Sequence, residues 1–111
     1  KHKSNAKFYD ENLKDIDGLT LLKREEGFDS SFWIYSVLVN DRDKFYKHMG
    51  NHGIAVSQVH ERNDKHTCVR EFACNLPNLD KTIGKMVSIP VGWWVTPEDR
   101  QYIVETIKKG W

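Results

Sequence analysis

Apolar side chains recur at spacings of three and four near the start of the chain, at Ala6, Tyr9, Leu13 and Ile16. This spacing places them on one stripe of a helix, so the pattern predicts a helix over residues 3–16. The Asp17-Gly18 pair that follows is typical of a helix end.

The end of the chain predicts a second helix, after Thr96-Pro97-Glu98-Asp99. Thr96 is a capping residue, Pro97 suits the first helical position, and acids in the first turn complement the helix dipole. Ile103 and Ile107 share one face, and Gly110 closes the element.

Residues 32–39, Phe-Trp-Ile-Tyr-Ser-Val-Leu-Val, give the strongest strand signal because they are aromatic and β-branched. Both alternating faces are apolar, which is typical of a central strand covered on both sides. We expect helices of this chain on one side and a partner domain on the other. Shorter strands are predicted over residues 19–23, 54–59 and 86–91.

Between these strands, Asn40 or Asp41 can cap a helix that runs to about Asn51. Residues 60–78 are polar and irregular, with a helical turn expected around 69–72, and residues 79–85 suit a short helix or turn. The order predicts an α+β fold in which helices pack on one face of a small antiparallel or mixed sheet. We expect one domain, residues 1–111, with an apolar sheet face left uncovered.

Composition supports a single globular domain: 111 residues, 39% hydrophobic, 12% aromatic and 30% charged. Seventeen basic and sixteen acidic side chains leave a formal charge of +1, which argues against nucleic acid or an anionic membrane as the partner. No apolar run approaches the roughly 20 residues of a spanning helix. The first residues lead into a polar helix and not into a signal peptide, so we expect a cytoplasmic protein.

The polar run from His60 to His66 follows a predicted strand directly, where functional side chains often project. His60 and Arg62, two positions apart, suit an anionic or hydroxyl-rich ligand, because Arg offers a fork of donors and His can donate or accept. The alternative is a solvated loop.

Other groupings give weaker signals. His60, His66, Cys68 and Cys74 could form a zinc site, although their spacing departs from the usual pairs. His48 and His52 share a helical face near a helix end, where surface histidines are common. Two cysteines make no disulfide framework. No phosphate-binding loop or hydrolase motif is present.

The Trp93-Trp94 pair ends the last predicted strand. We expect the two rings to seal the core under the final helix. The alternative is an aromatic wall at a pocket or an interface.

Several motifs follow one another along the chain: Asn5-Ala6-x-x-Tyr9-x-x-x-Leu13-x-x-Ile16, Ser31-Phe32-Trp33-Ile34-Tyr35, Val39-Asn40-Asp41-Arg42-Asp43, Gly53-Ile54 before His60, Leu76-Pro77-Asn78-Leu79-Asp80, Ile89-Pro90-Val91-Gly92-Trp93-Trp94 and Thr96-Pro97-Glu98-Asp99. Taken together, these motifs resemble the C-terminal small domain of the DegT/DnrJ/StrS sugar aminotransferases. The resemblance covers essentially the whole chain.

The resemblance implies the small domain of a pyridoxal-phosphate enzyme of fold type I that aminates keto sugars carried on nucleotides. In that family the Schiff-base lysine and most cofactor contacts lie in a large domain, so this chain alone would bind no cofactor and be inactive. A family histidine near the sugar corresponds to His60, and Arg62 is a weaker match. The implied partners are the large domain, or a second copy through the exposed sheet face, and a nucleotide sugar in the full enzyme.

Two other classes of protein remain open from the sequence. The first is a stand-alone binding or interaction module derived from such a domain. The second is a small metal-binding protein.

Overall fold

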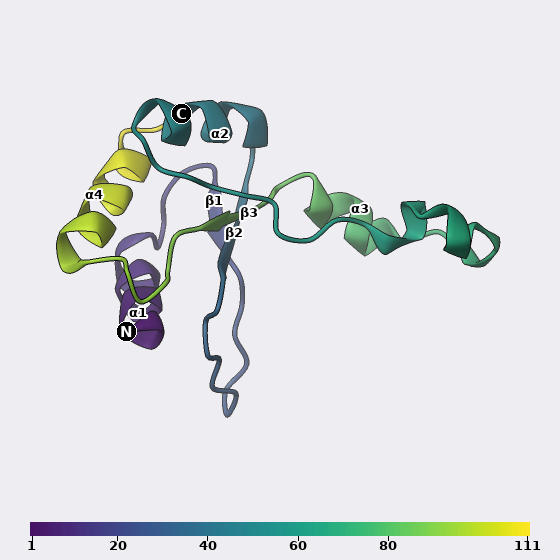
Figure 1. The fold of residues 1–111 in the computed structure, drawn as a ribbon, viewed down its shortest axis with the longest axis horizontal. Helices are drawn as coiled ribbons and strands as arrows, with labels where there is room; N and C mark the ends of the chain where they lie inside the picture. Colours follow the sequence, from purple (N-terminus) through teal and green to yellow (C-terminus); the bar gives the residue numbers. More distant parts are fainter.

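Three short antiparallel strands form the sheet: β1 (Leu19–Leu21), β2 (Tyr35–Val39) and β3 (Met86–Ile89). In this computed structural model, which describes residues 1–111, β2 lies between its two neighbours (Figure 1). Val37 at the centre of β2 is opposite Leu21 on one side and Val87 on the other. The sheet is therefore antiparallel, one of the two arrangements expected.

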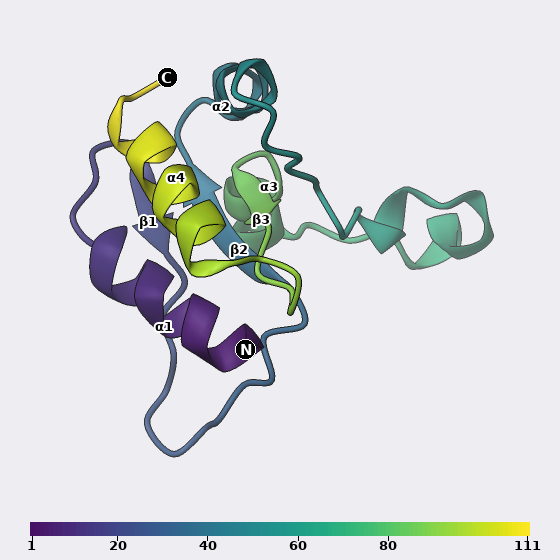
Figure 2. The ribbon, with the colours of Figure 1, turned by 60° about the vertical axis from the view of Figure 1, so that its left-hand side comes forward.

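The α-helices are α1 (His2–Asn12), α2 (Arg42–Asn51), α3 (Pro77–Ile83) and α4 (Pro97–Lys108). Two 3-10 helices, Asn63–Lys65 and Thr67–Phe72, lie between α2 and α3. Figure 2 shows α1 and α4 lying together over the sheet. None of the helices has the length and apolar character needed to span a bilayer.

The core lies between the sheet and the three helices α1, α2 and α4. Alternate residues of β2, namely Tyr35, Val37 and Val39, are buried on the helix-covered face. The helices and the turn after α1 add Ala6, Tyr9, Leu13, Phe45, Met49, Ile103, Val104 and Ile107. Burial of each Val, Leu, Ile, Phe or Met side chain among them contributes about 1.5–3 kcal/mol relative to leaving it exposed. The α+β prediction, with helices on one sheet face, is confirmed.

The two predicted helix caps are present. The Thr96 hydroxyl accepts a hydrogen bond from the Asp99 N–H at 3.1 Å, and the Asp99 carboxylate accepts one from the Thr96 N–H at 3.0 Å. At α2, the Asp41 carboxylate accepts from the Lys44 N–H at 3.1 Å. Both helices begin where these caps place them, because each cap satisfies an N–H that lacks a partner within the helix.

The first helix is shorter than predicted. It ends at Asn12, and Asp15 adopts the left-handed conformation with φ 60°. Leu13 is nevertheless buried and Ile16 packs against the core. The apolar spacing that predicted a helix to residue 16 therefore continues through a turn that keeps the same side chains inward.

The strand predicted over residues 54–59 is wrong. The segment makes a single β-bridge, between Ser57 and Ser88, beyond the outer edge of β3. Ile54 is buried, so the apolar signal is real, but the chain then turns polar and leaves the sheet. Strands β1 and β3 are also shorter than predicted. Helix α3 begins at Pro77 instead of residue 79, since proline suits the first helical position.

The second face of the sheet is less apolar than predicted. At its centre the hydroxyls of Ser36 and Ser88 share a hydrogen bond of 2.9 Å. Next to this pair, Leu38 lies opposite Met86, and both are half-buried. Only one face of β2 is therefore fully apolar. The other face carries hydroxyl groups, so it does not need to be covered by helices.

Two segments project from this body (Figures 1 and 2). One is the loop of residues 22–34; the other, called here the arm, is residues 60–76. The radius of gyration is 15.3 Å, against about 13 Å for a compact chain of this length. The excess reflects these projections, and the candidate site lies where they leave the body.

Candidate functional site

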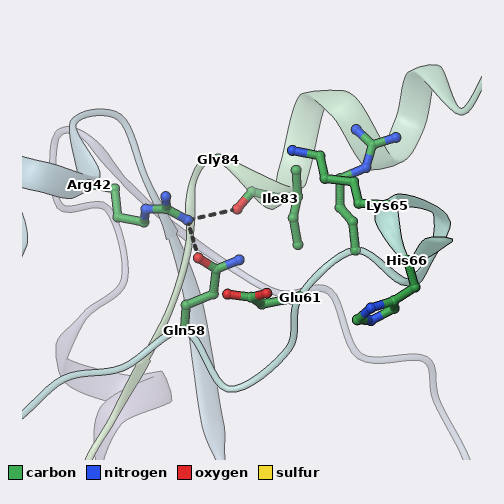
Figure 3. Close-up of a pocket in the computed structure, with 8 residues that line it drawn as sticks. Arg42, Gln58, Glu61, Lys65, His66, Ile83 and Gly84 are labelled. Atoms are coloured by element: carbon green, nitrogen blue, oxygen red, sulfur yellow. Dashed lines mark hydrogen bonds between the residues drawn. The ribbon is translucent and has the colours of Figure 1, made fainter.

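A polar groove of about 520 Å³ opens between the start of α2, the base of the arm and the end of α3 (Figure 3). It is lined by Arg42, Gln58, Glu61, Arg62, Lys65, His66, Ile83 and Gly84. Three of these are Arg or Lys, one is His, and one is a carboxylate. The groove therefore suits a polar ligand better than an apolar one.

Arg42 connects the three sides of the groove. Its Nη1 donates to the Gln58 side-chain oxygen at 2.7 Å and to the Ile83 main-chain oxygen at 3.0 Å (Figure 3). These bonds tie the start of α2 to the segment before the arm and to the end of α3. No local sequence pattern indicates this role, because Arg42 is the first residue of a capped helix and its partners are distant along the chain.

Arg62 is held by two carboxylates at the base of the arm. Its Nε and Nη2 donate to the two oxygens of Asp64 at 2.8 and 2.7 Å, and its Nη1 donates to Asp80 on α3. These hydrogen bonds raise the pKa of Arg62 above its ordinary value, and the bond from Arg62 lowers the pKa of Asp64. The guanidinium thus fastens the arm to α3.

His60 has a different neighbour from Arg62, although only one residue separates them. Its imidazole is exposed and meets the Trp33 indole edge to face, with ring centroids 6.1 Å apart and planes at 68°. Its main-chain oxygen accepts a hydrogen bond from Gln58 at 3.1 Å. His60 thus lies beside the 22–34 loop, while Arg62 lines the groove. That both contact one ligand stays a prediction.

Trp33, like Arg42, is a residue of this site that the sequence analysis did not single out. It is 67% exposed, at the bend before β2. The available signal was a tryptophan at the start of an otherwise buried strand. The pattern alone could not show that its ring meets a histidine from a distant segment.

The histidines and cysteines of the zinc hypothesis do not converge. Cys68 and Cys74 are exposed free thiols, and residues 1–111 hold no group of three or more potential ligands arranged for a metal ion. The other histidine pair has structural contacts. His48 Nε2 lies 2.8 Å from the Thr106 main-chain oxygen on α4, and His52 Nδ1 lies 2.8 Å from the His48 main-chain oxygen.

The prediction that Trp93 and Trp94 seal the core is wrong. The two side chains are 65% and 62% exposed and meet edge to face, with centroids 5.8 Å apart. The flanking Val91 and Val95 occupy the core positions instead, because the chain turns at Gly92 between them. The pair is therefore an exposed aromatic surface beside the start of α4.

Comparison with known proteins gives one consistent family. The sequence profile of the DegT/DnrJ/EryC1/StrS aminotransferase family matches residues 1–108. The erythromycin biosynthesis sensory transduction protein EryC1 of Saccharopolyspora erythraea is 24% identical over 110 residues, which cover 95% of this chain and 30% of that protein.

Solved structures agree. The sugar aminotransferase CalS13 from Micromonospora echinospora is 45% identical, with a TM-score of 0.96 over 99% of this chain and 30% of its own. AtS13 from Actinomadura melliaura is also 45% identical, with a TM-score of 0.95 over the same shares. The chain thus spans about 30% of the length of each relative.

Proposed function

The chain belongs to the DegT/DnrJ/EryC1/StrS aminotransferase family, and we propose that it forms the substrate side of the active site in a pyridoxal-phosphate-dependent sugar aminotransferase. The proposed substrate is a nucleotide-linked keto sugar. The observation that carries the proposal is the 45% identity and the TM-score of 0.96 to the sugar aminotransferase CalS13 over 99% of the chain.

Pyridoxal phosphate would supply the electron sink for amino transfer, from a lysine-bound form. The residues present here do not fit that group: every lysine of the chain is exposed, and none sits in an enclosed site that could exclude water from a covalent cofactor. We therefore assign the cofactor lysine to a large domain outside residues 1–111. The isolated chain is expected to be inactive.

The proposed contributions of this chain concern the sugar. His60 has an exposed imidazole that can donate to or accept from a sugar hydroxyl. Arg62 acts by holding the segment that carries His60, through its hydrogen bonds to Asp64 and Asp80. The large domain is the proposed partner, and the cytoplasm is the proposed location.

A second candidate function is a stand-alone interaction module. The observation in its favour is the exposed Trp93–Trp94 pair, because adjacent exposed tryptophans are typical of interface hot spots. A second copy of the chain would then cover the pair. Sedimentation of the 111-residue chain distinguishes the two functions: a dimer lost on Trp93→Ala supports the module, and a monomer supports the enzyme domain.

The enzymatic proposal is tested by joining the chain to its large domain. The joined protein is assayed for amino transfer to a nucleoside-diphosphate keto sugar, beside the isolated 111 residues. We expect turnover only in the joined protein. Turnover by the isolated chain, or a joined protein that binds pyridoxal phosphate but aminates no such sugar, contradicts the proposal.

A further inference from the structure

The backbone immediately before Trp33 is strained. Phe32 has φ 53°, in the left-handed region that aromatic residues rarely adopt. Such a conformation is unfavourable and persists only where surrounding contacts hold it. The Ser30 hydroxyl supports the turn by accepting a hydrogen bond from the Phe32 N–H at 3.2 Å.

Arg24 contacts this strained segment. Its guanidinium carbon lies 4.7 Å from the centre of the Phe32 ring and 5.3 Å from that of Tyr35. The same group pairs with the Asp10 carboxylate on α1 at 2.5 Å. Phe32 also packs against the core. The base of the 22–34 loop is therefore clamped to the body of the domain.

The consequence of this clamp is the placement of Trp33. With Phe32 turned toward the core, the next side chain points outward, where its indole is 67% exposed and meets the His60 imidazole. A tryptophan in this position adds little to the core. The strain in the chain thus maintains an exposed indole beside the proposed sugar-contacting histidine.

We propose that Trp33 is a substrate-contacting residue that binds the pyranose ring of the sugar by stacking, and that it also orients His60. This inference rests on the proposed function. An aromatic face carries negative charge density, and the C–H bonds on one face of a pyranose present weakly positive hydrogens to it. The indole supplies a flat surface for the ring, while the neighbouring His60 imidazole supplies a polar contact for a hydroxyl.

The test uses the full-length enzyme and four variants: Trp33→Ala, Trp33→Leu, Trp33→Phe and, as the control, Phe28→Ala. Phe28 lies in the same loop and is 80% exposed. For the keto sugar we expect KM to rise about tenfold in Trp33→Ala, as for the loss of one stacked ring. We expect a smaller change in kcat, substantial rescue by Trp33→Phe, little rescue by Trp33→Leu, and no change in Phe28→Ala.

A spectroscopic measurement separates contact with the sugar from a structural role. Tryptophan emission is titrated with a nucleoside-diphosphate keto sugar and, separately, with the nucleoside diphosphate alone. We expect the sugar-linked ligand to quench a component that is present in the wild type and missing in Trp33→Phe. Equal quenching of that component by the nucleoside diphosphate alone would place the base and not the sugar on the indole, and would overturn the proposal.

The kinetic outcomes separate this inference from the proposed function. If His60→Ala impairs the enzyme while Trp33→Ala leaves KM unchanged, the inference about Trp33 fails and the proposed function stands. Rescue by Trp33→Leu equal to that by Trp33→Phe shows that only bulk matters, and also overturns the inference. If neither His60→Ala nor Trp33→Ala has an effect, both fail.

Discussion

The rings of Tyr9 on α1 and Tyr35 on β2 meet edge to face, with centroids 5.2 Å apart. The Tyr9 hydroxyl donates to the Pro90 main-chain oxygen at 2.7 Å, and the Tyr35 hydroxyl donates to the Asp10 carboxylate at 2.6 Å. Each hydroxyl must therefore stay protonated to make its hydrogen bond, because the Pro90 carbonyl and the Asp10 carboxylate can only accept. This pair joins the first helix to the central strand beside the segment that carries Trp33.

The pair predicts loss of stability in alkali. Burial raises the pKa of both tyrosines above the ordinary value, and for Tyr35 the hydrogen bond to Asp10 raises it further. Above about pH 10 the unfolded chain loses these protons while the folded chain keeps them, so the free energy of unfolding falls as pH rises. Urea unfolding between pH 8 and 11 should show a shallower fall in Tyr9→Phe and in Tyr35→Phe.

The control for this prediction is Tyr102→Phe. Tyr102 is 44% exposed, and its hydroxyl donates to the His52 main-chain oxygen at 3.2 Å. All other ionisable groups are common to every variant, so the comparison isolates the phenols. A pH dependence in Tyr9→Phe as steep as in Tyr102→Phe would show that the buried phenol does not contribute.

The sequence predicted the elements that local chemistry determines. Thr96 predicted the start of α4, Asn40 or Asp41 predicted the start of α2, and the aromatic and β-branched run around Val37 predicted the central strand. The prediction failed where a tertiary contact determines the local structure, as in the strand predicted over residues 54–59. Ser57 pairs with only one residue of β3, and nothing local indicates that the chain leaves the sheet there.

The candidate site shows the same division. His60 was identified because a polar run follows an apolar segment. Its neighbour Trp33 comes from a segment far along the chain, and so does Asp80, which binds Arg62. Contacts between such distant segments cannot be predicted from local patterns in one sequence. The exposed Trp93 also misled the prediction, because valines on either side fill the core in its place.

Removal of the Arg62 side chain is predicted to make the arm easier for a protease to cleave. Arg62→Ala removes the bonds to Asp64 and Asp80, so the arm should open more often. Chymotrypsin cleavage after the exposed Phe72 should become several-fold faster, with Arg62→Lys intermediate because lysine cannot bind both carboxylate oxygens as a fork.

The matched control for the arm is Arg70→Ala, which removes the same charge from an exposed position within the arm. We expect its rate of cleavage after Phe72 to remain near that of the wild type. Equal acceleration in both variants would mean that net charge, and not the bonds made by Arg62, governs the opening of the arm.

Substitution of Gly92 by alanine is predicted to displace the Trp94 ring. A Cβ at this position would collide with the Trp94 indole. Because Trp94 is largely exposed, the ring can swing away, so Gly92→Ala should cost only about 0.5–1.5 kcal/mol. The two adjacent indoles should give an exciton couplet, a pair of circular dichroism bands of opposite sign, in the wild type. This couplet should be lost in Gly92→Ala.

The comparison for Gly92 is Gly50→Ala, in helix α2 with open space around the added carbon. That substitution should stabilise the protein by roughly 0.5–1 kcal/mol, since alanine is favoured over glycine inside a helix. An unchanged couplet in Gly92→Ala would show that the two indoles pack differently in solution.

The most direct test of the central claim is kcat/KM for a nucleoside-diphosphate keto sugar in the full-length enzyme carrying His60→Ala, with His2→Ala on α1 as the matched control. Loss of one hydrogen bond to the substrate predicts a fall of about tenfold in His60→Ala and none in His2→Ala, with bound pyridoxal phosphate equal in both. A kcat/KM in His60→Ala equal to that of the wild type would contradict the account.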